Sequence, residues 1–165
     1  MKTEDHLRLC DACAGTTYCT AVIRRTDEEW RILLPPDVYR VARQAGTETP
    51  FSGIYADCHD EGVYVCACCG THLFFSKDKF DSGTGWPSFA RPVCPDNVEW
   101  HEDHSHGMVR TEVLCRRCSA HLGHVFDDGP PLPDGTRYCM NSLSLSLITC
   151  EMHESDTNMA KSGRE

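Results

Sequence analysis

Two pairs of cysteines with identical spacing place the strongest constraint on how this chain can fold. Cys66 and Cys69 form one C-x-x-C pair, and Cys115 and Cys118 form a second. Two intervening residues make a tight turn that directs both thiolates of a pair at one ion, and two such pairs complete a tetrahedral shell. The spacing therefore predicts one zinc ion that joins two segments far apart in the sequence.

One further cysteine competes for a place in this shell. Cys68 lies inside the first pair, but its pairing with either neighbour lacks the two-residue turn. Gly70 follows Cys69 at a position where such a turn can use positive φ. We therefore expect Cys66 and Cys69 to be the ligands. A closed shell of four sulfurs leaves no position for water or substrate, so the zinc would be structural and any chemistry would lie elsewhere.

Twelve cysteines in 165 residues also raise the question of disulfides. The first residues contain no apolar run typical of a secretory signal, and Glu4, Asp5 and Asp11 argue against a mitochondrial presequence. We therefore expect a cytoplasmic protein, with organellar targeting as an alternative. In a reducing compartment, clustered cysteines are more often metal ligands or redox-active thiols than disulfides. Disulfide bonding of the four zinc cysteines is the minor alternative.

Charge and hydropathy limit the partners of the chain. A formal net charge of -9, without a basic stripe, argues against nucleic acid. No run approaches the roughly 18 consecutive apolar residues of a membrane span. The length suits one domain, and we expect a monomer. Weak apolar periodicity at both ends predicts a flexible N-terminal segment (1–25) and a flexible C-terminal tail (151–165) around a folded domain (26–150).

Within this domain the expected helices come first. Thr26 and Glu29 fit a capping box at the start of one short helix. Pro35-Pro36 ends that helix and begins a second. After Pro50, short apolar runs at 62–66 and 72–75 and alternation at 109–114 and 143–147 indicate strands. The expected fold is mainly antiparallel β.

Three further segments, at 83–89, 121–126 and 137–142, contain groups capable of chemistry, and each also has a structural explanation. Trp86 could be a core residue at a turn. His121 and His124 could lie on the surface or bind a metal. Cys139 could be an inert core thiol.

Cys139 nevertheless shares a strand face with Arg137, and a guanidinium beside a thiol favours the thiolate. An imidazole from His121 or His124 could donate a proton to a leaving oxygen. Spacing alone leaves two interpretations open. One is a thiol enzyme, and the other is a non-catalytic protein-interaction module held together by zinc.

Several motifs in the same order give the chain a strong resemblance to B-type methionine sulfoxide reductases. The resemblance extends from about residue 34 to residue 147 and includes both cysteine pairs. The other matching motifs are Pro50-Phe51-Ser52-Gly53-Ile54-Tyr55, Phe80-Asp81-Ser82-Gly83-Thr84-Gly85-Trp86-Pro87-Ser88-Phe89, Arg110-Thr111-Glu112-Val113, Ala120-His121-Leu122-Gly123-His124-Val125-Phe126 and Arg137-Tyr138-Cys139-Met140-Asn141-Ser142.

This resemblance implies a fold, an activity and residue roles. The fold would be two antiparallel sheets in a β-tent or barrel-like arrangement, with short N-terminal helices and a structural zinc site. The activity would be reduction of the R epimer of methionine sulfoxide, in proteins and possibly as the free amino acid, through a sulfenic acid on Cys139. Trp86 and Phe126 would bind the substrate. The polar catalytic groups would be His124, His121, Asn141 and Arg137. A thioredoxin-like dithiol protein would regenerate the enzyme.

The chain departs from a common pattern of that family at Thr84. Many members carry a cysteine within this segment that resolves the sulfenic acid, and threonine cannot form a disulfide. Cys58, just before the first cysteine pair, and Cys19, in the N-terminal segment, are the candidate resolving thiols. The sequence gives neither a distance to Cys139.

Overall fold

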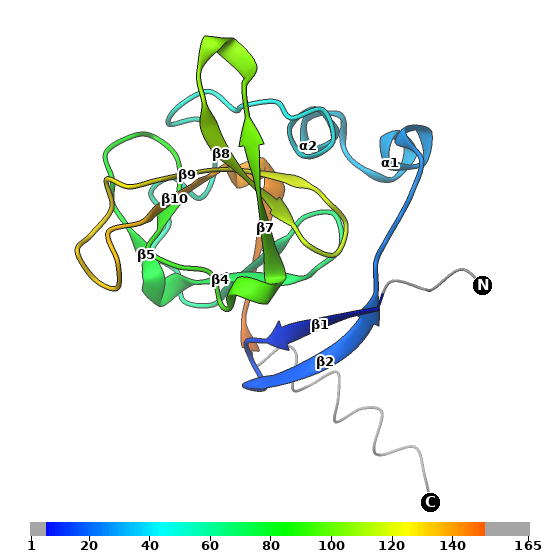
Figure 1. Cartoon of the computed structure of the whole chain (residues 1–165), viewed down its shortest axis with the longest axis horizontal. Helices are drawn as coiled ribbons and strands as arrows, with labels where there is room; N and C mark the ends of the chain where they lie inside the picture. Colours follow the sequence, from blue (N-terminus) through cyan, green and yellow to red (C-terminus); the bar gives the residue numbers. More distant parts are fainter. Residues whose placement is uncertain (1–5, 151–165) are drawn as a thin grey trace, which may run out of the picture.

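A computed structural model describes residues 6–150 of the chain (Figure 1). Its largest element is a six-stranded antiparallel sheet with the order β5-β6-β10-β9-β8-β7. The strands are β5 (Lys79–Phe80), β6 (Ser88–Phe89), β7 (Val98–Asp103), β8 (Arg110–Cys115), β9 (His121–Phe126) and β10 (Arg137–Met140). β9 and β10 run side by side through the middle, and the long β7-β8 hairpin projects beyond them (Figure 1).

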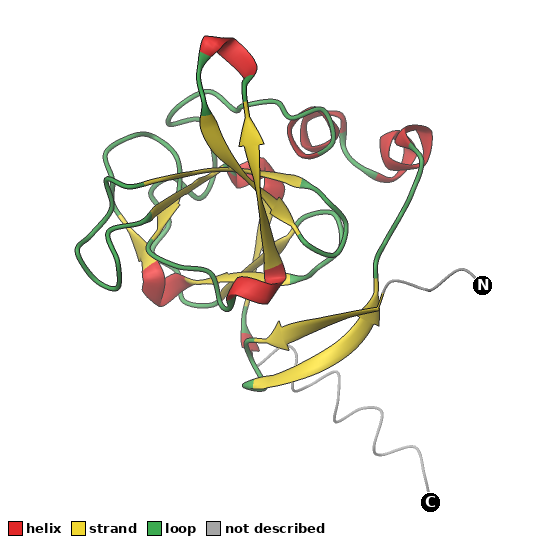
Figure 2. Cartoon of the chain, in the orientation of Figure 1, coloured by secondary structure: helices red, strands yellow, loops and turns green. Residues whose placement is uncertain are grey.

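A second antiparallel sheet has the order β11-β3-β4. It consists of β3 (Val63–Cys66), β4 (His72–Phe75) and β11 (Leu145–Ile148). The expectation of a mainly antiparallel β fold is therefore confirmed (Figure 2). The barrel-like alternative is wrong for the described residues, because the strand order of each sheet ends in two open edges. The tent arrangement stays a prediction.

Two short α-helices precede these sheets, as expected. They are α1 (Asp27–Leu33) and α2 (Pro36–Ala42). The capping box is present, with Glu29 N–H donating to Thr26 Oγ1 at 3.2 Å and Thr26 N–H donating to the Glu29 carboxylate at 2.8 Å. No helix within residues 6–150 is long and apolar enough to cross a membrane.

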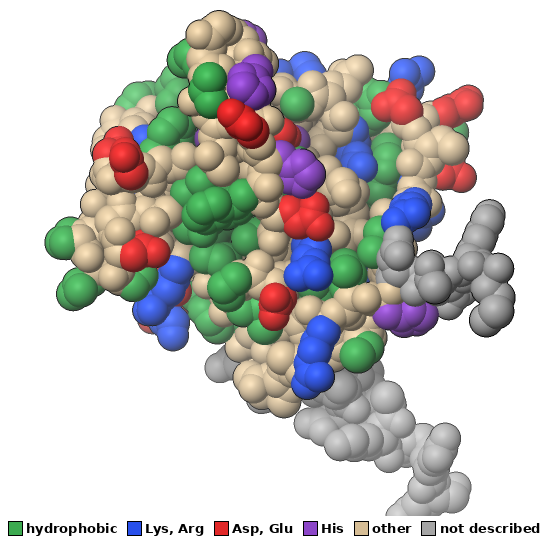
Figure 3. All heavy atoms as spheres, viewed as in Figure 1, with side chains coloured by type: hydrophobic (Ala, Val, Ile, Leu, Met, Phe, Trp, Pro, Cys, Tyr) green, Lys and Arg blue, Asp and Glu red, His purple; other side chains and the backbone are tan. Residues whose placement is uncertain are grey.

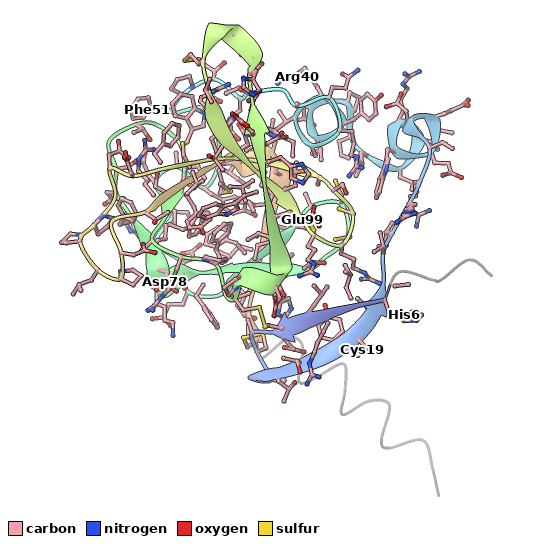
Figure 4. All side chains as sticks on the ribbon, viewed as in Figure 1. His6, Cys19, Arg40, Phe51, Asp78 and Glu99 are labelled. Carbon is pink, nitrogen blue, oxygen red and sulfur yellow. A yellow bond between two sulfur atoms is a disulfide. The ribbon has the colours of Figure 1, made fainter. Side chains whose placement is uncertain are left out.

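The N-terminal segment differs from its expected flexibility. A hairpin is formed by β1 (His6–Asp11) and β2 (Thr16–Ala21), which adds a third sheet. Asn97 binds this hairpin to the domain, since its side chain accepts from Cys10 N–H at 2.8 Å and donates to Cys10 O at 3.0 Å. Two disulfides, Cys10–Cys94 and Cys13–Cys150, add covalent links (Figure 4). Such long-range contacts order a segment whose own apolar pattern is weak. The predicted tail, 151–165, lies outside the described residues.

Aromatic packing fills the space between the two larger sheets. Phe74 of β4 stacks on Phe89 of β6 with ring centroids 4.4 Å apart, and Tyr64 of β3 meets Phe89 edge-on at 5.1 Å. All three side chains are fully buried. On the face shown in Figure 3, acidic and basic side chains are interspersed around an apolar area. The core therefore holds β6, and with it β10, in a fixed position.

Candidate functional site

Four cysteines from two remote turns meet at one point. Cys66 and Cys115 end β3 and β8, and Cys69 and Cys118 follow in the next turns. Their four sulfur atoms all lie within 4.8 Å of one another. The closest pairs are Cys66–Cys118 at 3.6 Å and Cys69–Cys115 at 3.5 Å. Four sulfur atoms that each lie about 2.3 Å from one tetrahedral zinc ion are separated by slightly more than the 3.5 and 3.6 Å of these two pairs. The cluster therefore fits a metal ion.

Both cysteine turns have the same backbone form. Gly70 N–H donates to Cys66 O and Ser119 N–H donates to Cys115 O, each at 2.8 Å. The residue after each pair adopts positive φ, 76° at Gly70 and 62° at Ser119. The interpretation of Gly70 as a turn residue is confirmed. Cys68 lies outside the four-donor cluster.

A second site surrounds Cys139 on β10. A cavity of about 90 Å³ lies beside this residue. It is lined by Thr47, Trp86, Arg110, Gly123, His124, Phe126, Cys139, Met140 and Asn141. Gly123 allows a close approach of β9 to β10, because a Cβ atom there would lie 2.0 Å from Cys139 O. Five of the predicted site residues thus come together: Cys139, Trp86, Phe126, His124 and Asn141.

His124 faces Cys139 across the β9-β10 pair. Its Nε2 lies 2.7 Å from Asp103 Oδ2 on β7. Burial lowers the pKa of His124, while the hydrogen bond from His124 lowers that of Asp103. Burial thus disfavours the imidazolium form of His124, and the hydrogen bond to Asp103 favours it. We assign a proton to Nε2, as a donor to the carboxylate.

His121 lies next to His124 rather than on the cavity wall. The two rings meet edge-on with centroids 5.4 Å apart. His121 Nδ1 lies 2.7 Å from Glu112 Oε1, and its buried Nε2 has no hydrogen-bond partner among residues 6–150. Asp103 and Glu112 thus orient the two histidines. Sequence reasoning assigned neither carboxylate a role, although Glu112 belongs to a quoted motif.

Arg137 and Cys139 lie on the same face of β10, as predicted. Arg137 Nε donates to Asp128 at 2.8 Å, and its guanidinium lies over the Phe126 ring at 4.6 Å from the centroid. Burial nevertheless raises the pKa of the Cys139 thiol, while Arg137 and Thr84 act in the opposite direction. The cation favours the thiolate, as expected, but burial has the larger effect.

Glu48 is a site residue that sequence reasoning missed. Its main-chain oxygen accepts from Trp86 Nε1 at 3.0 Å, and its N–H donates to Asn141 Oδ1 at 3.1 Å. Its carboxylate accepts from Leu143 N–H at 3.1 Å, which fixes this main chain beside the end of β10. The side chain is only 3% exposed, and burial raises its pKa. Glu48 therefore supports two side chains of the cavity, the indole of Trp86 and the amide of Asn141.

Replacement of Glu48 by alanine should lower kcat/KM by roughly 10-fold for the sulfoxide substrate that the family resemblance implies. Loss of one buried hydrogen bond of about 1 to 2 kcal/mol would loosen the segment that holds Trp86 and Asn141. Glu48→Gln is the matched control, since its amide oxygen can still accept from Leu143 N–H. Steady-state kinetics on both variants provide the measurement. An alanine variant with wild-type kcat/KM would show that Glu48 does not support the site.

Neither candidate resolving thiol lies on the wall of the Cys139 cavity. Cys58 lines a separate cavity of about 180 Å³ with His59, Lys79 and Asp81. Cys19 is exposed on β2, at the outer side of the N-terminal hairpin (Figure 4). The Thr84 side chain lies close enough to Cys139 to lower the pKa of its thiol through a hydrogen bond.

Comparison with known proteins adds independent information about this site. The SelR domain model matches residues 34–149, which include both cysteine pairs and the Cys139 cavity. The chain is 53% identical over 135 residues to the peptide methionine sulfoxide reductase MsrB of Acinetobacter baylyi, covering 82% of this chain and 96% of that protein. The chain belongs to the MsrB family. The MsrB of Herminiimonas arsenicoxydans is 54% identical over 137 residues, covering 82% and 99% of the two chains. The resemblance noted from the motifs is therefore confirmed.

Proposed function

We propose that this MsrB-family chain reduces methionine sulfoxide to methionine and that it acts on the R epimer in oxidised proteins, with the free amino acid as a further candidate substrate. The observation that carries the proposal is the placement of Cys139 in one small cavity with Trp86, Phe126, His124 and Asn141. The names of its relatives support the same reaction. An apolar wall beside a nucleophile and polar hydrogen-bonding groups suits a methyl sulfoxide, which has one apolar and one polar substituent on sulfur.

The proposed reaction begins with attack of the Cys139 thiolate on the sulfoxide sulfur. The oxygen then takes up a proton and becomes bonded to the Cys139 sulfur, while the sulfur–oxygen bond of the substrate and the new bond between the two sulfurs both break. Methionine leaves, and Cys139 becomes a sulfenic acid. Cysteine is oxidised by two electrons and the sulfoxide is reduced by two. Trp86 and Phe126 would contact the substrate methyl group, and Asn141 would orient the oxygen.

His124 and His121 are the candidate sources of the proton. Each ring is held by a carboxylate, from Asp103 or Glu112, at one nitrogen. When protonated, the other nitrogen of either ring can donate to an oxygen that becomes basic as its bond to sulfur weakens. His124 lines the cavity and is the more direct donor, while His121 lies behind it. We propose His124 as the acid and His121 as its neighbour in the network.

The four-cysteine cluster would hold one structural Zn²⁺. Four thiolates suit zinc and leave no coordination position for substrate. The ion would hold β3 and β8 together, and these strands belong to the two larger sheets. We propose no catalytic step for this cluster.

Regeneration would require a dithiol reductant. We propose that the Cys139 sulfenic acid is returned to the thiol by a thioredoxin-like protein, directly or after a disulfide with Cys58 or Cys19. In the direct route, a reductant thiol displaces water to form a mixed disulfide, and its second thiol then releases Cys139. Mass mapping of the protein after one turnover distinguishes the routes. A persistent sulfenic acid would rule out both internal thiols.

The proposed activity has a simple test. The protein, dithiothreitol and a peptide with racemic methionine sulfoxide are incubated together, and the peptide is analysed by mass and by chiral separation. We expect loss of one oxygen from half of the peptide, and consumption of the R epimer alone. Consumption of both epimers would refute the stereochemical assignment. A protein that consumes neither epimer would instead fit the non-catalytic zinc module.

Replacement of Arg137, the cation beside Cys139, should change how the reactivity of the Cys139 thiol depends on pH. Because Arg137 opposes the effect of burial, Arg137→Met should raise the pKa of Cys139 further. Reaction with iodoacetamide requires the thiolate, so the rate-versus-pH curve should move to higher pH, with a roughly 10-fold slower reaction at neutral pH for a shift of one pH unit. Arg91→Met, which removes an ion pair with Asp78 and lies outside the lining of the Cys139 cavity, is the control. An unchanged midpoint in Arg137→Met would contradict the assigned effect.

A further inference from the structure

The turn of the N-terminal hairpin gathers a second set of metal-binding side chains, outside both sites described above. Cys10 and Cys13 form a further C-x-x-C pair at this turn. Their disulfide partners, Cys94 and Cys150, come from the loop after β6 and from the residues after β11. The bonds lie where the hairpin meets the body of the protein (Figure 4). Neither the proposed reaction nor the four-cysteine cluster uses these thiols.

Three donors lie close together within this region. Asp11, Cys13 and His72 each offer one ligand atom, and the three atoms lie within 4.8 Å of one another. His72 Nδ1 is 3.7 Å from Asp11 Oδ1. Both side chains are mostly shielded, at 12% and 20% exposure. Cys150 Sγ is bonded to Cys13 Sγ and so lies next to this group, although it is not among the three donors that are all within 4.8 Å of one another.

The surrounding backbone prepares these groups for a ligand role. Ala12 N–H donates to His72 Nδ1 at 3.0 Å, so this nitrogen carries a lone pair rather than a proton. Asp11 Oδ1 accepts from Cys13 N–H at 3.0 Å and from Ala14 N–H at 2.9 Å, which orients the carboxylate. Buried Asn97 donates to His72 O at 2.7 Å and also binds the backbone of Cys10, so it holds β1 against β4. The donors thus sit on a rigid frame.

We propose that reduction of the Cys13–Cys150 disulfide creates a second zinc site, with Cys13, Cys150, His72 and Asp11 as ligands. Two thiolates, one imidazole and one carboxylate form a donor set typical of zinc. The separation of His72 Nδ1 and Asp11 Oδ1 is close to that of two ligands on one tetrahedral zinc ion, roughly 3.3 Å for bonds of about 2.0 Å. Metal binding at Nδ1 replaces its hydrogen bond from Ala12.

The exchange of the Cys13–Cys150 disulfide for a zinc ion requires two electrons and two protons. A dithiol reductant supplies two electrons and two protons to the disulfide and becomes a disulfide itself. The two thiols formed on Cys13 and Cys150 then release their protons as they bind Zn²⁺. In the reverse exchange, the disulfide form of a dithiol protein takes up two electrons from the two thiolates, the Cys13–Cys150 bond re-forms and the ion is expelled. The hairpin is therefore fastened to the domain by a metal under reducing conditions and by a disulfide under oxidising conditions.

Cobalt binding tests this proposal, because Co²⁺ substitutes for Zn²⁺ and gives visible bands that depend on its ligands. The full-length protein is reduced, freed of metal and titrated with Co²⁺ without oxygen. We expect two equivalents per reduced chain and one per chain that keeps its disulfides. Thiol titration verifies each state, with twelve thiols in the reduced chain. Binding of only one equivalent to a chain with all twelve thiols free would overturn the proposal.

Single variants identify the ligands. His72→Ala and Cys150→Ser should each reduce the stoichiometry from two to one, while the spectrum of the four-thiolate site stays intact and shows that the fold persists. Cys10→Ser is the matched control, since Cys10 belongs to the same turn but not to the ligand set, and should keep two equivalents. If His72→Ala keeps both equivalents, or if Cys10→Ser loses one, the proposed ligand set is wrong.

Discussion

Replacement of Cys139 by serine is expected to reduce the rate of methionine sulfoxide reduction by three orders of magnitude or more. A serine hydroxyl stays protonated at neutral pH and cannot take up the oxygen as a sulfenic acid. Loss of the nucleophile from other enzymes that use one has effects of this order or larger. The rate is measured in a single turnover without added reductant, by following the mass of an oxidised peptide.

A matched control separates this effect from general loss of a thiol. Cys19→Ser should consume one equivalent of sulfoxide at the wild-type rate, because the step that removes the oxygen from the substrate uses Cys139 alone. Serine is nearly isosteric with cysteine, so both variants should melt close to the wild-type temperature. A folded Cys139→Ser variant that still reduces the sulfoxide at the wild-type rate would refute the assigned nucleophile.

Replacement of Cys118 by serine is expected to remove the metal and much of the stability. The Cys118 side chain is buried, and its loss opens the four-thiolate shell that links two distant turns. Structural zinc sites contribute on the order of 10 kcal/mol in zinc-finger peptides, an amount comparable with the whole stability of a domain. We therefore expect a lower zinc content and a melting temperature lower by tens of degrees, measured by metal analysis and thermal denaturation.

Cys68→Ser provides the control for this experiment. Cys68 lies inside the same turn but outside the four-donor cluster, so its replacement should leave zinc content and melting temperature close to those of the wild type. Full zinc content and an unchanged melting temperature in Cys118→Ser would show that Cys118 is not a ligand. If Cys118→Ser keeps its zinc and its melting temperature while Cys68→Ser loses the metal, Cys68 is the ligand and Cys118 is not.

Local patterns predicted those parts of the molecule that depend on short stretches of sequence. The C-x-x-C spacing identified the four clustered cysteines, because a two-residue turn determines where both sulfurs point. The Thr26 capping box and the helix start at Pro36 depend on neighbouring residues alone, and both were confirmed. The strand containing Cys139 and Arg137 was also predicted, since alternation determines which side chains share a face.

Features that depend on distant contacts could not be read from the sequence. The N-terminal hairpin is ordered by Asn97 and by two disulfides whose partners lie 84 and 137 residues away. Glu48 contributes mainly through its main chain, which any residue type possesses, so no side-chain pattern marks it. The pairing of His124 with Asp103 requires β7, β8 and β9 to lie in one sheet.

The role of Cys139 as the nucleophile is best tested by a single turnover of the reduced protein with a peptide that contains racemic methionine sulfoxide. After one turnover the peptide is separated by epimer, and the protein is treated with a sulfenic acid reagent, digested and mapped by mass. We expect loss of up to one equivalent of the R epimer, with the oxidation on Cys139, either as a sulfenic acid or as a disulfide that includes it. Consumption of sulfoxide with Cys139 recovered as the free thiol, or no consumption by folded protein, would contradict this role.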